Sequence, residues 1–185
     1  MGSAFKEQPI RNTKPGGEDA RSGLSPSRMC DLVRRWFEDV LSGTVADPSH
    51  AKPGIWDAAD VELGQLFTRD FVNHIVPCPP GGWKRGVAGA VQIIQSYRVS
   101  CPDLTIEIEE QMVSGDKVIT RYMAEGTHTA GKFLHMPANS HHYKVSGIAI
   151  DRIENGKIAE SWGQWDTCSL LIQMGVLPAD LQALD

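Results

Sequence analysis

Two side chains in this sequence stand where proton-transfer chemistry can be expected. His74 ends a short apolar run and directly precedes a loop rich in proline and glycine at positions 77–82. A neutral imidazole at the rim of a pocket exchanges protons near pH 7, which makes His74 a candidate catalytic acid or base. The alternative is a histidine that only completes a structural hydrogen bond.

Asp166 is the second candidate catalytic residue. It closes the run 160–166, where Glu160, Trp162 and Gln164 would share its face if the run is a strand without a bulge. A carboxyl group beside a large aromatic ring in a dry pocket has a raised pKa and can act as an acid or base. The alternative is that Asp166 caps the N-terminus of the helix that follows.

The strand expected from Val118 to about Thr129 divides its side chains between two faces. Tyr122 and His128 share one face, and Arg121 lies on the other. Arg121 can clamp an anion or an enolate, or it can form a salt bridge on the outer face of the sheet. Together with an aromatic residue of the first helix, these positions give the predicted substrate-binding set: Trp36, Arg121, Tyr122, His128, Trp162 and Gln164.

Sequence motifs for nucleotides, metals and nucleophilic serines are absent. The chain has no glycine-rich phosphate loop, no H-E-x-x-H and no G-x-S-x-G. His141 and His142 are adjacent, and neighbours on a strand point to opposite faces, so an exposed polar loop is the simpler interpretation. We therefore expect neither a metal site nor a cofactor.

The composition is that of a water-soluble globular protein. Of 185 residues, 41% are hydrophobic and 22% are charged, and the net charge of −5 disfavours nucleic acid as a partner. No apolar run approaches the length of a membrane span, and the N-terminus lacks the apolar core of a secretion signal. The four cysteines are scattered, which indicates free thiols. We expect a cytoplasmic protein.

The pattern of helices and strands predicts an α+β fold. An amphipathic helix begins at Ser25-Pro26, and further helices fit positions 55–67 and 86–97. Strands follow over 71–76, 104–109, 118–129, 143–153 and 158–165, with a hairpin turn at 154–156 and helical turns at 169–174 and after Pro178. A curved antiparallel sheet with the helices on one face would enclose a cone-shaped hollow suited to a small molecule.

The polar segment 1–25 is predicted to be a flexible arm, and 26–185 a single domain. The alternative is an arm draped on a partner subunit. Isoleucine and valine occur on both faces of the strand near Val145, Ile148 and Ile150, which suggests that a second copy covers the outer face. We expect a symmetric homodimer.

Several segments in order resemble the SnoaL-like polyketide cyclases of the NTF2-like superfamily. They are Val72-Asn73-His74, Arg85-Gly86, Pro102-Asp103-Leu104, Gly126-Thr127-His128-Thr129, the run 152–158, Glu160-x-Trp162 and the run 170–175. The resemblance covers roughly residues 28 to 178. It implies a cone-shaped α+β barrel, often oligomeric, and ring closure of a polyketide by an acid/base carboxylate without a metal or cofactor.

The sequence departs from the family pattern at the end of the last strand. The family commonly reads Glu-His-Trp-Asp there, and this chain reads Glu160-Ser161-Trp162-Gly163. The resemblance assigns proton abstraction to the missing aspartate. The family's histidine on the preceding strand is missing too, since that strand reads Gly147-Ile148-Ala149-Ile150.

Three hypotheses about function remain open at this stage. The first is a cofactor-free cyclase, isomerase, dehydratase or hydrolase acting on a small apolar or polyketide-like substrate. The second is a ligand-binding module without catalysis, and the third is a dimerisation domain. If His74 and Asp166 carry the chemistry, both should lie on the wall of one cavity near Trp36 and Trp162; otherwise the non-catalytic hypothesis gains.

Overall fold

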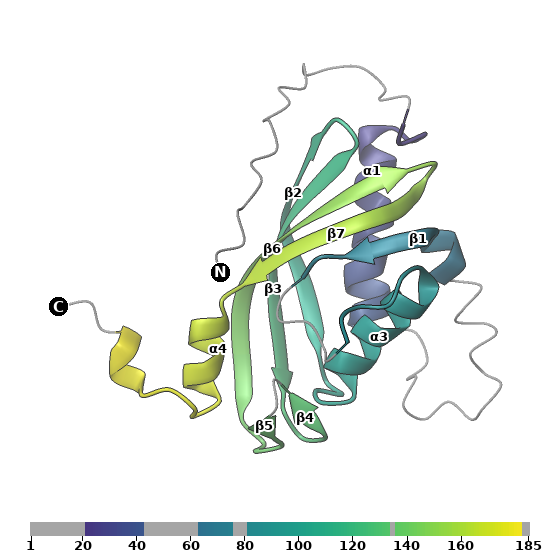
Figure 1. Ribbon diagram of the computed structural model, residues 1–185. Coiled ribbons are helices and arrows are strands. Elements are labelled where there is room, and N and C mark those ends of the chain that lie inside the picture. Colours follow the sequence, from purple (N-terminus) through teal and green to yellow (C-terminus); the bar gives the residue numbers. More distant parts are fainter. Residues whose placement is uncertain (1–20, 43–62, 76–80, 134–135, 183–185) are drawn as a thin grey trace, which may run out of the picture.

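The computed structural model describes residues 21–42, 63–75, 81–133 and 136–182 (Figure 1). Five strands form one curved, unclosed sheet in the order β1-β7-β6-β3-β2, and two short strands form a separate hairpin. The strands are β1 Phe67–Asn73, β2 Thr105–Ser114, β3 Lys117–Thr127, β4 Lys132–Phe133, β5 Met136–Pro137, β6 His142–Glu154 and β7 Lys157–Trp165. This arrangement confirms the predicted α+β class.

Helices pack mainly on one side of this sheet. They are α1 Pro26–Arg34, the π-helix η1 Arg35–Leu41, α3 Val87–Arg98, α4 Thr167–Gln173 and the 3-10 helix η2 Ala179–Gln182. Figure 1 shows α1 and α3 on the same side of the sheet, and α4 at the end of β7. No helix in the part of the chain that the structure describes could cross a membrane.

The first helix follows the sequence prediction closely. Ser25 precedes it and Pro26 occupies its first turn, where a missing N–H group costs nothing. From residue 35 the helix widens into a π-helix, in which the Ser42 N–H donates to the Phe37 carbonyl at 3.1 Å. The wider turn lets Trp36, Phe37, Val40 and Leu41 all face the core.

Cross-strand pairing explains the long antiparallel strands. Alternating side chains place one buried face of β6 against the helices, and the β6–β7 hairpin turns at Asn155 and Gly156, whose φ angles are 49° and 75°. Both central residues of this turn adopt positive φ, as the Asn-Gly pair predicted. β1, however, runs parallel to β7, so the sheet is not wholly antiparallel as expected.

The boundary between the second helix and the first strand was predicted wrongly. Phe67 already belongs to β1, and β1 ends at Asn73, so His74 lies just beyond the strand. Phe67 and Phe71 are both buried, and a spacing of four residues fits a helix as well as a strand. Residues 63–66 are helical, and the rest of the predicted helix over 55–67 lies outside the described residues.

The folded body begins a few residues before the predicted end of the arm. The Asn155 N–H donates to the Arg21 carbonyl at 3.0 Å, and the Gly156 N–H donates to the Ser22 carbonyl at 2.7 Å. Backbone hydrogen bonds hold this segment, and they leave no trace in the hydrophobic pattern. Residues 1–20 of the predicted arm lie outside the described residues.

Candidate active site in the cone

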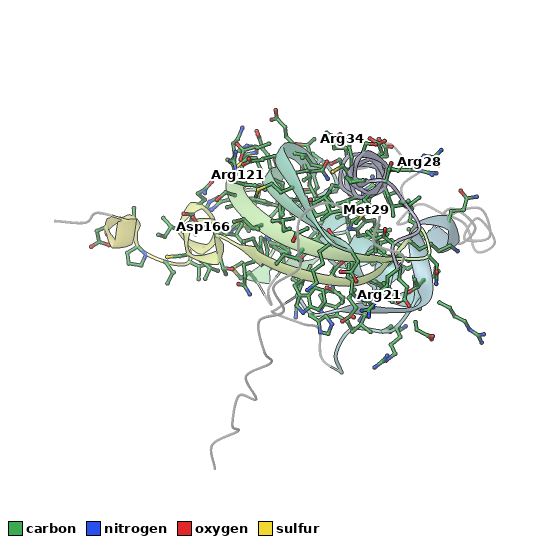
Figure 2. The ribbon with its side chains drawn as sticks, turned by 90° about the horizontal axis from the view of Figure 1, so that it is seen from above. Arg21, Arg28, Met29, Arg34, Arg121 and Asp166 are labelled. Atoms are coloured by element: carbon green, nitrogen blue, oxygen red, sulfur yellow. The ribbon has the colours of Figure 1, made fainter. Side chains whose placement is uncertain are left out.

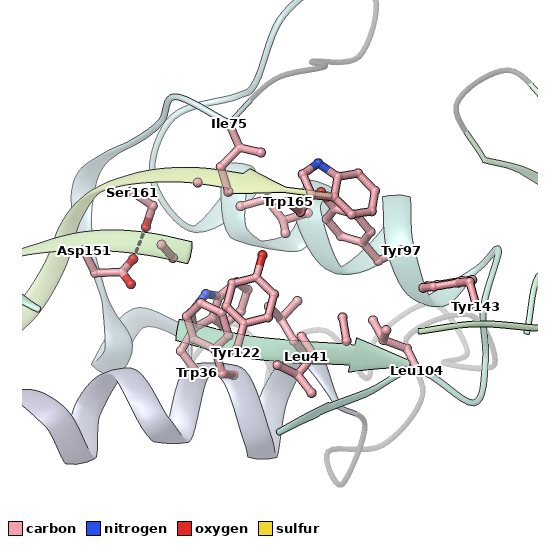
Figure 3. A pocket seen from close by; sticks show the side chains of 16 residues that line it. Trp36, Leu41, Ile75, Tyr97, Leu104, Tyr122, Tyr143, Asp151, Ser161 and Trp165 are labelled. Atoms are coloured by element: carbon pink, nitrogen blue, oxygen red, sulfur yellow. Dashed lines mark hydrogen bonds between the residues drawn. The ribbon is translucent and has the colours of Figure 1, made fainter. Parts of the chain in front are cut away.

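A cavity lies between the inner face of the sheet and the helices that cover it (Figure 3). Its walls are mostly aromatic and aliphatic. They are formed by Trp36, Phe37, Leu41, Ile75, Ile93, Tyr97, Leu104, Ile106, Tyr122, Ala124, Tyr143, Ala149, Asp151, Ser161, Gly163 and Trp165. The free volume is about 70 Å³. A cavity that holds benzene measures about 150 Å³, so a ring-sized ligand must displace part of the wall.

Asp151 is the charged residue of this wall. Only 1% of the surface of Asp151 is exposed, and the Ser161 hydroxyl donates a hydrogen bond to its Oδ1 atom. Its other oxygen, Oδ2, is buried without a hydrogen-bond partner. Burial raises the pKa of Asp151 to about 7, although the hydrogen bond from Ser161 acts in the opposite direction. The carboxyl group can therefore give or take a proton near neutral pH.

The register of the sheet explains how Asp151 and Ser161 come together. On β6 the inward positions are every second residue, and Ala149, Asp151 and Ile153 are three of them. Asp151 pairs with Ser161 of β7 across the antiparallel ladder. Residues paired in this way project to the same face of a sheet, so both side chains enter the cavity.

Tyr122 places a hydroxyl group inside the cavity. Figure 3 shows its ring rising from β3 between Asp151 and Trp165. The neighbouring position on β6 is Gly147, where an added Cβ would lie 2.4 Å from Cζ of Tyr122. Burial raises the pKa of Tyr122, and the nearby Asp151 adds to this effect, so the hydroxyl keeps its proton and can donate a hydrogen bond.

Ile75 covers the part of β7 that lies next to Ser161. Its backbone N–H donates to Oδ1 of Asn73 at 3.1 Å, and its carbonyl accepts the indole N–H of Trp83 at 2.8 Å. The Ile75 side chain lies over Gly163, where an added Cβ would be 3.2 Å away from it. Glycine at position 163 therefore leaves room for Ile75 to form the wall beside Asp151 and Ser161.

His74 does not lie on the cavity wall, contrary to the prediction. Its ring stacks on Trp162 at 4.8 Å between centroids, and its Nε2 is 2.9 Å from Oε2 of Glu160. Glu160 also accepts hydrogen bonds from Arg152 at 2.8 Å. Trp162 and Glu160 belong to the face of β7 opposite to Ser161, so this network lies outside the cone.

Asp166 lies outside the cavity as well. Its carboxylate accepts hydrogen bonds from the Ser169 N–H at 2.9 Å and the Ser169 hydroxyl at 2.6 Å, which makes it the N-cap of α4. These bonds lower the pKa of Asp166. Asp166 therefore has the capping role that was its alternative. The inner face of β7 is formed by odd-numbered residues, and Asp166 is not among them.

Arg121 and Gln164 face away from the cone too. Arg121 forms ion pairs with Glu109 and, at 3.6 Å, with Glu110, which is the salt bridge considered as its alternative role. Figure 2 shows Arg121 and Asp166 toward α4 and away from α1. Both residues, with Gln164, border a shallow hollow on the outer face.

Trp36, Tyr122 and His128 have two different outcomes. Trp36 and Tyr122 line the cavity, as their predicted roles require. His128 is completely buried but packs near Phe133, with a centroid distance of 5.9 Å, and is not part of the cavity wall. Burial lowers the pKa of His128.

Sequence inspection missed Asp151, Ser161 and Gly147. A signal for Asp151 was nevertheless present: it shares the parity of Val145, Ala149 and Ile153 and is an acid among apolar neighbours. Among the described residues, no three His, Cys, Asp or Glu side chains are grouped as metal ligands would be. Cys30, Cys101 and Cys168 are free thiols, and Cys78 lies outside the described residues.

Sequence comparison identifies the family to which this α+β fold belongs. The model of the SnoaL-like polyketide cyclases matches residues 53–174. The chain therefore belongs to the SnoaL-like polyketide cyclase family, and the resemblance predicted from the sequence is confirmed. A search of curated proteins finds no match.

Solved structures agree with this assignment. A putative polyketide cyclase from Bacillus cereus is 25% identical, with a TM-score of 0.60, over 83% of this chain and 87% of that one. TsrD from Streptomyces laurentii is 22% identical, with a TM-score of 0.65, over 83% of this chain and 99% of its own. A putative SnoaL-like polyketide cyclase from Jannaschia is 18% identical, with a TM-score of 0.64, over 84% and 98%. The last two likenesses concern the fold.

The acid of this cavity is displaced relative to the family pattern. The resemblance puts the family's aspartate at Gly163, which pairs with Ala149. Asp151 and Ser161 are the next inward-facing pair along the same two strands. A carboxyl group thus enters the same cavity, but from β6 and one pair further along the sheet.

Proposed function

We propose that the cone binds a small apolar or polyketide-like molecule and that Asp151 exchanges a proton with it. The observation that carries the proposal is the isolation of this carboxyl group in an apolar cavity, with Oδ2 unpartnered and a pKa near 7. A solvated aspartate has a pKa of about 4, so its carboxylate binds protons only weakly at neutral pH. A buried one becomes a base strong enough for neutral pH.

The reaction class that fits is removal of a proton from a carbon next to a carbonyl group. Asp151 would accept the proton, and the Tyr122 hydroxyl would donate a hydrogen bond to the carbonyl oxygen as it gains negative charge. The walls are mostly apolar, and the low local dielectric strengthens both interactions. The resulting enolate leads to ring closure, isomerisation or loss of a leaving group, according to the substrate.

Ligand binding without turnover is the second candidate. It is supported by the loss of the family's aspartate and histidine, and by the positions of His74 and Asp166 outside the cavity. The two candidates differ in one respect: only the enzyme needs the carboxylate of Asp151 to act as a base.

A substrate-independent assay of the buried base separates them. Nitrobenzisoxazole loses the C–H proton of its isoxazole ring to a base while its N–O bond breaks, and the ring opens to a coloured cyano-nitrophenolate. Carboxylates perform this elimination much better in apolar surroundings, because desolvation increases their basicity. We expect the wild-type protein to catalyse it with a pH midpoint of about 7.

Three variants make the result specific. Asp151→Asn should lower the rate by about 100-fold or more, the usual contribution of a general base. Asp166→Asn, at an acid outside the cavity, should leave the rate unchanged. Ile75→Ala adds room beside Asp151 for the aromatic probe. If neither the wild type nor Ile75→Ala accelerates the elimination, Asp151 is not an accessible base and the binding-only function is the better one.

A further inference from the structure

Ser161 and Asp151 form a hydrogen-bonded pair on the cavity wall, and this pair has a use besides proton transfer to and from a carbon atom. The Ser161 hydroxyl donates a hydrogen bond to Oδ1 of Asp151 and lines the same cavity. In that orientation the lone pairs of Oγ are free to face a ligand. A hydroxyl group hydrogen-bonded to a base inside a pocket is the arrangement that activates a nucleophile.

We propose that Ser161 is a nucleophile that takes the acyl group of a small carboxylic ester, with Asp151 as its base. This would be a second activity of the cavity, acyl transfer to the chain followed by hydrolysis. It rests on the proposed function in one respect, because both need Asp151 to accept a proton.

The steps balance without any further reactant than the ester and water. Oγ of Ser161 attacks the carbonyl carbon and its proton passes to Asp151. The tetrahedral intermediate collapses, the C–O bond to the leaving group breaks, and Asp151 returns the proton to the departing alcohol. A water molecule then attacks the acyl carbon and gives a proton to Asp151. The second tetrahedral intermediate collapses, the bond between Oγ and the acyl carbon breaks, and Asp151 returns the proton to Oγ, which releases the carboxylic acid and restores the Ser161 hydroxyl.

The basicity of Asp151 suits this role. An ordinary aspartate, with a pKa near 4, is too weak a base to activate a hydroxyl group. Burial brings the pKa of Asp151 to about 7, close to that of the imidazole that serves as base in many acyl-transfer enzymes.

Other features of the wall agree with an acyl site at Ser161. The Tyr122 hydroxyl enters the same cavity from β3 (Figure 3), and in the proposed reaction it would donate to the oxygen of the intermediate. The Ile75 side chain lies over Gly163, the next inward-facing residue of β7, so Ile75→Ala would widen the approach to Ser161. The other hydroxyl groups of the described wall belong to tyrosines whose pKa burial raises, and so they are poor nucleophiles.

The test uses nitrophenyl acetate, because the free volume of the whole cavity is only about 70 Å³ and acetyl is a small acyl group. The full-length protein is incubated with the ester, stopped in acid, digested and analysed by mass spectrometry for acetylation. We expect one acetylated peptide, modified at Ser161. Ser161→Ala should abolish this adduct and lower nitrophenol release by about 100-fold or more. Ser146→Ala, an exposed serine on the outer face of β6, should change neither.

The elimination assay on the same variants keeps the two proposals apart. Acyl transfer is refuted if neither the wild type nor Ile75→Ala forms an adduct at Ser161. If Ser161→Ala still catalyses the elimination in that case, the proton-transfer function stands. An adduct at Ser161 without elimination activity would support the nucleophile and refute proton abstraction from carbon. If the protein shows neither an adduct at Ser161 nor elimination activity, both proposals are overturned.

Discussion

Replacing Asp151 by asparagine should stabilise the protein at neutral and alkaline pH, and the gain should disappear in acid. In the unfolded chain this carboxyl group loses its proton near pH 3.8, whereas in the folded protein it does so near pH 7. Between these values the folded state binds more protons than the unfolded state. The free energy of unfolding of the wild type therefore falls as the pH rises through this window.

The size of the effect follows from the two pKa values. Their difference, 7 minus 3.8, is about 3. Each pKa unit corresponds to about 1.4 kcal/mol, so the ionised carboxylate costs about 4 kcal/mol of stability above pH 7. At pH 4 the cost is below about 1 kcal/mol, because this pH lies only just above the pKa of 3.8 that the carboxyl group has in the unfolded chain. Asparagine has no such dependence, and any change in its hydrogen bond with Ser161 adds a constant.

Urea unfolding of the wild type and Asp151→Asn, followed by the fluorescence of the five tryptophans, measures the difference at pH 4, 6 and 8. The stability of the variant relative to the wild type should increase by about 3–4 kcal/mol from pH 4 to pH 8. Asp166→Asn is the control, and its difference from the wild type should stay nearly constant over this range. Hydrogen bonds lower the pKa of Asp166 below its ordinary value of 3.8, so its contribution is lost only in stronger acid. A difference between wild type and Asp151→Asn that is constant with pH would refute the buried, proton-exchanging carboxyl group.

Three further predictions follow from other contacts. Gly147→Ala should lower the melting temperature and the elimination rate together, because its Cβ would lie 2.4 Å from Cζ of Tyr122 and force the ring away. His128→Leu should remove part of the stability loss below about pH 6.5, since burial lowers the pKa of His128 and the unfolded chain takes up that proton first. Light scattering should give twice the chain mass of 20.3 kDa, and Ile148→Glu, at a residue 50% exposed on the outer face, should give the monomer; a monomeric wild type would exclude the homodimer.

The secondary structure could be predicted because most elements have one buried face. The first helix repeats its apolar residues with the helical period, and β6 alternates buried and exposed side chains over its whole length. The parallel pairing of β1 with β7 is a different matter, because it depends on contacts far apart in the sequence that no local pattern encodes.

The site was harder to predict because the inner face of a strand usually carries large apolar side chains, whereas a strand beside a cavity carries small ones there. On β7 the outer face carries Trp162, while the inner face near Asp151 carries the small residues Ser161 and Gly163. Large apolar side chains on the inner face would fill the hollow. Each face of β7 carries a tryptophan, Trp162 on the outer face and Trp165 on the inner face. An acid close to a large aromatic ring therefore did not identify the inner face, and the prediction selected Asp166.

The π-helical segment Arg35–Leu41 has a consequence for how such a pocket can change in evolution. A π-helix differs from an α-helix by one extra residue in the turn. Deleting one residue here would restore the α-helix and rotate the segment relative to α1, so that Trp36, Phe37 and Leu41 would present different surfaces to the cavity. A single codon inserted or lost in this helix can thus reshape the ligand site while every strand, and the pair Asp151–Ser161, stays where it is.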